Sequence, residues 1–212
     1  MKRKCSLIML CMCMLLMTGC SSTELEERCF PLLAVVGYDD QKVTFWAGFP
    51  KTDEGEGSTS SEIKVRMVSG KNFEKSKEEY ESHLNKMADY NHLKVLVLED
   101  DLLENTTAYH SMLDTLSQTE NFPRNTYVCA VEDVDELVEM EKNLPQDIGT
   151  YLEEYLMNQE AKKERLLTLG DLLDERENQQ MILYMPYLEV EDSFVKWNGY
   201  VNIFGESWQE SR

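Results

Sequence analysis

One short segment, Leu93–Leu98, constrains the fold more than any other part of the chain. Five of its six residues are Leu or Val, and only Lys94 interrupts the run. A strand with one face in water alternates apolar and polar residues, whereas a strand covered on both faces is apolar almost throughout. The segment therefore predicts the central strand of a sheet that is covered on both sides.

Three further strands are predicted on its amino-terminal side. Leu32–Tyr38 and Lys42–Ala47 are joined by the turn residues Asp39–Gln41, which is typical of a hairpin. Glu62–Val68 alternates with a period of two, so it predicts a third strand with one face in water, paired with the second. Lys51–Ser61 is rich in Thr, Ser, Gly and acidic residues, which indicates a loop.

Helices are predicted around the central strand. Phe73–Met87 carries apolar residues at spacings of three and four, and Asn72 is placed to cap its start. A helix over Leu102–Leu116 leads to a strand over Thr126–Val131, and a short helix follows over Val134–Leu144. Strand, helix and strand in this order indicate a parallel crossover.

The rest of the chain predicts two helices and two strands. Residues 149–176 are helical in composition, with a break at Gly170. Met181–Val190 and Val195–Phe204 are strand-like around Asn198–Gly199, which suggests a hairpin at the sheet edge, with Pro186 at an edge or bulge. The expected fold class is α/β (α+β), a mixed central β-sheet flanked by helices, in a single domain that follows a cleaved signal peptide.

The amino terminus has the pattern of an export signal. Three basic residues precede an apolar run over residues 5–17, which is shorter than the roughly 20 residues that a spanning helix needs. The following Met17–Cys20 resembles a lipobox, so we expect a lipid on Cys20 and cleavage before it. The expected division is a signal peptide over 1–19, a lipidated tether over 20–31, a domain over 32–204 and a tail over 205–212.

Charge excludes some partners. The whole chain carries a net charge of −19, and removal of the three basic residues in 1–19 takes the mature chain to −22. Nucleic acid is therefore not expected as a partner, and anionic lipid headgroups repel the body of the protein. Processing leaves Cys20, Cys29 and Cys129, and the last two could form a disulfide or remain buried free thiols.

The strongest candidate for chemistry is Glu99–Asp101, at the end of the predicted central strand. Open α/β sheets often bind ligands at this edge, so an exported binding protein or hydrolase is one interpretation. The favoured interpretation is that Asp100 and Asp101 provide a cap and first-turn acids for the next helix. His83, His92 and His110 have no metal-binding spacing. No catalytic, metal-binding or cofactor-binding residue is predicted, and the chain is not expected to be an enzyme.

Several segments, taken in order, resemble the amino-terminal domain of the Ger(x)C family, the lipoprotein C subunits of spore germinant receptors. They are Gly19–Cys20 with Glu24–Leu25, Leu33–Asp39, His92–Leu102, the residues Asp114, Leu116, Arg124 and Asn125 before Tyr127–Val131, and then Met185–Val190 and Gly199–Phe204. The chain departs from the family by Ser21 after the cysteine, and it stops where family members continue into a carboxyl-terminal domain.

The resemblance implies a non-enzymatic role in nutrient-triggered germination. It implies polytopic A and B subunits as partners, and attachment through Cys20 to the outer face of the cytoplasmic (spore inner) membrane. Because nutrient binding in such receptors is assigned mainly to the A and B subunits, no ligand-binding residue is carried over to this chain.

Overall fold

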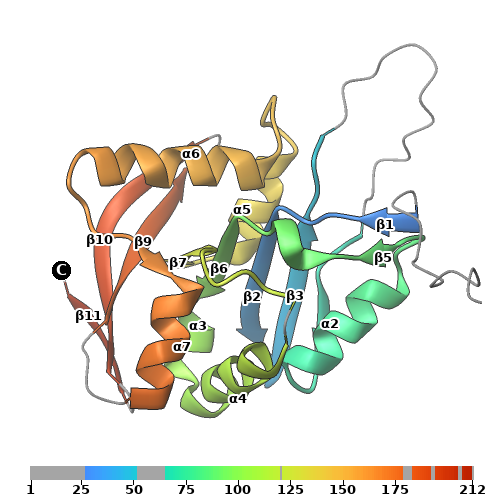
Figure 1. The fold of residues 1–212 in the computed structure, drawn as a ribbon, viewed down its shortest axis with the longest axis horizontal. Helices are drawn as coiled ribbons and strands as arrows, with labels where there is room; N and C mark the ends of the chain where they lie inside the picture. Colours follow the sequence, from blue (N-terminus) through green and yellow to red (C-terminus); the bar gives the residue numbers. More distant parts are fainter. Residues whose placement is uncertain are drawn as a thin grey trace, which may run out of the picture.

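The structure, a computed structural model, describes residues 27–51, 65–119, 121–178, 183–191, 194–204 and 207–211. These residues form a mixed β-sheet with helices on both faces (Figure 1), which confirms the predicted fold class. The main sheet has the order β11-β10-β9-β7-β6-β2-β3-β4, and β8 pairs with β7 off this path.

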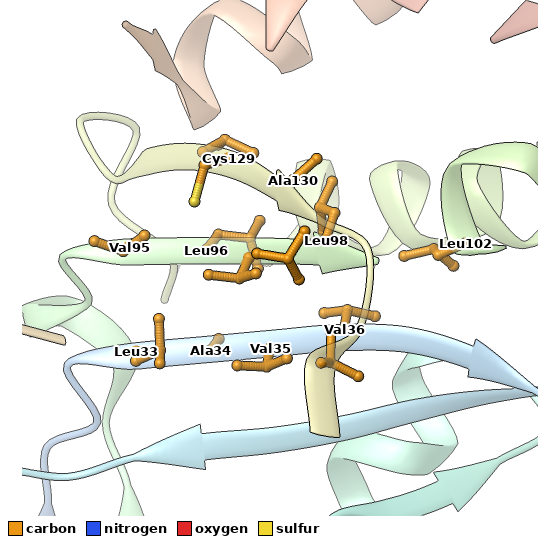
Figure 2. Packing of buried hydrophobic residues seen from close by; sticks show 14 of the residues in the cluster. Leu33, Ala34, Val35, Val36, Val95, Leu96, Leu98, Leu102, Cys129 and Ala130 are labelled. Carbon is orange, nitrogen blue, oxygen red and sulfur yellow. The ribbon is translucent and has the colours of Figure 1, made fainter. Parts of the chain in front are cut away.

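The middle of the sheet is parallel, and it contains the segment that the sequence marked as central. The parallel strands are β2 (Leu33–Asp39), β6 (Val95–Glu99), β7 (Tyr127–Val131) and β9 (Leu183–Glu191). β6 lies between β2 and β7 (Figure 2), and the side chains of Val95–Leu98 are completely buried. The prediction of a doubly covered central strand is therefore confirmed.

A hairpin joins β2 to β3 (Lys42–Gly48), as predicted. Asp40 and Gln41 both have positive φ angles, 44° and 61°, as a tight two-residue hairpin turn requires. β4 (Val68–Gly70) pairs with β3, but it begins later than the predicted strand, whose residues 62–64 lie outside the described part of the chain. Val65 stays outside the ladder, and its carbonyl accepts a hydrogen bond from Nε1 of Trp46 at 3.1 Å.

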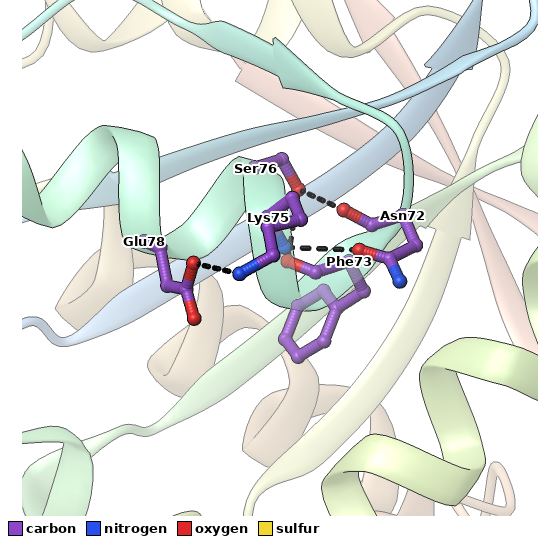
Figure 3. A network of polar contacts seen from close by, with 5 residues as sticks. All are labelled: Asn72, Phe73, Lys75, Ser76 and Glu78. Carbon is purple, nitrogen blue, oxygen red and sulfur yellow. Dashed lines mark hydrogen bonds and ion pairs between the residues drawn. The ribbon is translucent and has the colours of Figure 1, made fainter.

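The first long helix, α2 (Phe73–Ser82), begins where the sequence predicted. The Asn72 side chain accepts a hydrogen bond from the backbone N–H of Lys75 at 3.0 Å (Figure 3). The helix ends five residues before the predicted Met87. Met87 and Ala88 instead form β5, which pairs in parallel with β1 (Arg28–Cys29) in a separate two-stranded sheet.

The crossover from β6 to β7 contains two helices where one was predicted. These are α3 (Asp100–Glu104) and α4 (Thr106–Gln118). Asn105 separates them, because its side chain caps α4 by accepting a hydrogen bond from the N–H of Ala108 at 3.0 Å. The predicted helix after β7 is α5 (Val134–Glu141).

The carboxyl-terminal elements correct two predictions. The break after α6 (Ile148–Ala161) comes well before Gly170, with Lys163 at a φ of 74°, and Gly170 lies inside α7 (Leu169–Asn178) just after β8 (Leu167–Thr168). The two closing strands do pair antiparallel as a hairpin, β9 with β10 (Phe194–Phe204), and Pro186 lies at a bulge as expected, but Asn198–Gly199 forms that bulge within β10 and is not the turn. β11 (Ser207–Ser211), in the segment expected to be a tail, pairs with β10.

Helices cover the two faces of the sheet unequally. α2, α4 and α7 lie together along one side, and α6 crosses the other (Figure 1). The chain enters β2 at the amino ends of the parallel strands, and the carboxyl ends of these strands meet at the opposite edge.

Candidate functional site

The carboxyl ends of the parallel strands border a hollow of about 1360 Å³. The predicted acidic segment lies here, since β6 ends at Glu99 and α3 begins at Asp100. Carboxylates dominate the lining, and no Lys, Arg or His is found among the described residues that line it. The lining carboxylates are Asp39, Glu99, Asp101, Glu132, Asp133, Asp135, Glu136 and Glu189.

Glu99 links two segments of the fold inside this hollow. Its carboxylate accepts hydrogen bonds from the backbone N–H of Tyr38 at 2.9 Å and from that of Val134 at 3.3 Å. It therefore joins the end of β2 to the start of α5. Burial raises the pKa of the Glu99 carboxyl above its ordinary value, the two N–H groups oppose the shift, and nearby Asp101 and Asp133 add to it.

Asp100 and Asp101 have different surroundings. The carboxylate of Asp100 accepts a hydrogen bond from the hydroxyl of Tyr187 at 2.9 Å, which connects α3 to β9. Asp101 is exposed and lines the hollow. Both are first-turn residues of α3, as the favoured interpretation held, but the residue at the N-cap is Glu99, and its side chain makes no capping hydrogen bond.

The rim of the hollow contains one capping residue that sequence reasoning missed. The carboxylate of Asp133 accepts hydrogen bonds from the N–H groups of Asp135 at 2.7 Å and Glu136 at 3.3 Å, so it caps α5. The signal was present in the sequence, because an Asp followed three residues later by Glu before an apolar segment is a common helix start.

A binding protein or hydrolase that used Glu99–Asp101 would need free carboxylates there, but two of the three already accept hydrogen bonds within the fold. Glu99 and Asp100 are held by hydrogen bonds within the fold. Among the described residues, no group of three or more His, Cys, Asp or Glu side chains is placed to hold a metal ion. The hollow is therefore a region of concentrated negative charge at one edge of the sheet.

The three histidines lie in separate places. His83 follows α2, and its Nδ1 is 2.7 Å from the carbonyl oxygen of Glu79. His92 stacks edge-on against Phe30, and His110 lies on α4.

Cys29 and Cys129 are buried free thiols, so the disulfide alternative is not realised in the structure. Burial raises the pKa of the Cys29 thiol, and it raises that of Cys129 to about 12. Both thiols are therefore poor nucleophiles near neutral pH. Cys20, the predicted site of lipid attachment, lies outside the described residues.

Within the described part of the chain, none of the helices has the length and apolar character needed to cross a membrane.

Comparison with known proteins identifies the family. A family model described as the spore germination protein N-terminal domain matches residues 21–190. Neither the curated proteins nor the solved structures gave a match. The matched region contains the central strand and the eight carboxylates that line the hollow, and it covers most of the chain. The chain therefore belongs to the spore germination protein family, through an amino-terminal domain of the Ger(x)C type.

Proposed function

We propose that this protein is a lipid-anchored, non-enzymatic subunit of a germinant receptor. In this proposal it acts in nutrient-triggered spore germination beside polytopic A-type and B-type subunits. A diacylglyceryl lipid on Cys20 holds it at the outer face of the spore inner membrane.

One observation carries the proposal. The family match begins at residue 21, directly after the cysteine that ends the lipobox-like Met17–Cys20 segment. The family gives the role in spore germination, and the position of the match leaves Cys20 as the first residue before the domain. Two acyl chains suffice for stable anchoring where one is marginal.

Anchoring has a physical consequence for partner binding. A tethered protein meets membrane partners at a high effective concentration, so a weak interface suffices for assembly. The fold also favours a binding role over a chemical one, because Glu99 and Asp100 serve as structural acceptors.

Lipid attachment is tested with Cys20→Ser in sporulating cells that are fed an alkynyl fatty acid. The wild-type protein should take up the label, and its mass should be that of a chain that begins at lipid-modified Cys20. The variant should take up no label. Cys13→Ser, in the apolar run of the leader, is the matched control and should be labelled like the wild type. A labelled Cys20→Ser protein, or an unlabelled wild-type protein, would contradict the anchor.

Receptor partnership is tested by crosslinking the protein in intact spore membranes and identifying what it captures. Multispanning proteins should be recovered with the wild type and be depleted with Cys20→Ser. Recovery of soluble proteins alone from wild-type membranes would contradict the receptor assignment.

A further inference from the structure

The chain enters the fold at one end of the molecule. β1 and β5 form their own two-stranded sheet at one end of the long axis, and β9 and β10 lie at the other end (Figure 1). Arg28 at the start of β1 is held by an ion pair with Asp89, with 2.9 Å between Nη1 and Oδ2. This ion pair joins the start of β1 to the residue that follows β5, so it adds to the pairing of the two short strands.

The sequence limits how far this end can be from Cys20. Eight residue steps separate Cys20 from Arg28, and at 3.3–3.6 Å per residue they span at most about 29 Å. A compact domain of this length is about 40 Å across. A lipid on Cys20 therefore keeps the start of β1 within about 29 Å of the bilayer, whereas the tether sets no such limit for the end formed by β9 and β10.

Charge favours the same orientation. At this end of the described structure, the basic side chains of Arg28, Lys77 and Lys86 balance the acidic ones of Glu27, Glu81 and Asp89, on a chain with a net charge of −19. The acidic hollow lies elsewhere, at the carboxyl ends of the parallel strands. Anionic headgroups therefore repel the hollow and tolerate the β1–β5 end.

One apolar side chain stands out at this end. Four large hydrophobic side chains are exposed in the described structure, and only Met87, on β5, belongs to the β1–β5 end, where it is 50% exposed. A stable protein interface buries about 800 Å² on each partner, which a single exposed Met with charged neighbours does not provide. An apolar side chain beside Lys86 suits the boundary between headgroups and acyl chains, where long basic side chains reach back to the phosphates.

We propose that the β1–β5 end, through Met87 and Lys86, rests on the phospholipid headgroup layer. This inference depends on the lipid at Cys20 proposed above. It makes the acidic hollow face away from the membrane, toward the space where soluble domains of partner proteins can reach it.

The test uses the full lipidated chain with Met87→Cys, labelled with a fluorophore that responds to polarity. Met157→Cys on α6 is the matched control, because Met157 is 51% exposed and is also a methionine. Cys29 and Cys129 are buried with raised thiol pKa values, and lipidation blocks Cys20, so the introduced cysteine reacts selectively. The labelled proteins are reconstituted in phosphatidylcholine–phosphatidylglycerol vesicles with and without headgroup-spin-labelled lipid.

The probe at position 87 should emit at shorter wavelength and be quenched severalfold more by the spin-labelled lipid than the probe at position 157. Equal quenching of the two probes on a lipidated, vesicle-bound chain would overturn the orientation alone. Shielding of position 87 that appears only with receptor subunits present would assign this end to a protein partner instead. A purified wild-type chain without lipid would overturn both the anchor and this orientation.

Discussion

At Gly37, the space that a methyl group needs is already occupied. A Cβ atom there would lie 2.3 Å from Oε2 of Glu99 and 2.6 Å from Oγ1 of Thr44. Glycine at this position of β2 therefore lets the Glu99 carboxylate reach the N–H of Tyr38. Conformational freedom of the backbone plays no part, because no positive φ is involved.

We expect Gly37→Ala to lower the free energy of unfolding by about 1–3 kcal/mol, the usual cost of overpacking. In a double-mutant cycle with Glu99→Ala, urea unfolding should show a smaller effect of Gly37→Ala, because the shortened side chain removes the closer of the two contacts and only that with Thr44 remains. Additive effects of the two substitutions would show that the close contact with Glu99 is not the cause.

Glu99 should also give the protein a characteristic pH dependence. Its pKa is raised in the folded state, so the stability it contributes is fully present below its unfolded pKa and is lost as pH rises through the folded value. Glu99→Gln cannot titrate, and it leaves one backbone N–H without an acceptor, at a cost of about 1–3 kcal/mol.

The stability advantage of the wild type over Glu99→Gln should therefore be largest at acidic pH and shrink toward neutral pH. Urea unfolding of both proteins at a series of pH values measures this difference, and the other carboxylates cancel because both proteins contain them. An advantage that grows with pH would mean that the hydrogen bonds from Tyr38 and Val134 outweigh burial.

At the scale of elements, the sequence predicted the strands of the core better than the ends of the helices. Burial on both faces leaves a local signature, as in Leu93–Leu98, and turn residues mark the β2–β3 hairpin. The sequence did not predict that Asn105 separates α3 from α4, because the helical spacing of apolar residues continues across it. The single capping side chain of Asn105 leaves only a weak signal within such a pattern. Met87, the first residue of β5, was predicted as the end of a helix because the partner strand, β1, is distant in sequence.

The same limit applies to the hollow. The sequence placed Glu99–Asp101 at a strand end, but hydrogen bonds to Tyr38, Val134 and Tyr187 depend on segments that only the fold brings together. Local sequence therefore identified where the carboxylates lie and not what holds them.

The cap at Asn105 can be tested directly. Asn105→Ala should lower the free energy of unfolding by about 0.5–2 kcal/mol, because the N–H of Ala108 loses its side-chain acceptor. Asn105→Ser, which retains a capping oxygen, should recover most of this loss in thermal unfolding. Equal destabilisation by the two substitutions would show that Asn105 acts through another contact.

On the scale of the whole molecule, charge is unevenly distributed. Eight carboxylates line the hollow without a basic side chain among the described lining residues, while α6 carries its acids on an exposed helix surface. Like charges that share one concave surface repel each other more strongly than the same number spread over a convex one. The hollow should therefore dominate the salt dependence of stability.

Screening distinguishes this repulsion from specific cation binding. The Debye length falls from about 30 Å at 0.01 M salt to about 8 Å at 0.15 M, so NaCl should raise the thermal unfolding temperature of the wild type. The rise should be smaller for Asp39→Asn/Glu132→Gln, which removes two exposed carboxylates from the hollow, than for Glu154→Gln/Glu160→Gln, which removes two from α6. Equal salt responses in the two double variants would contradict the argument. CaCl₂ is then compared with NaCl at equal ionic strength. If CaCl₂ raises the thermal unfolding temperature much more, and only Asp39→Asn/Glu132→Gln loses this difference, the hollow binds a cation. The acidic hollow would then be a ligand site instead of a surface that repels the membrane.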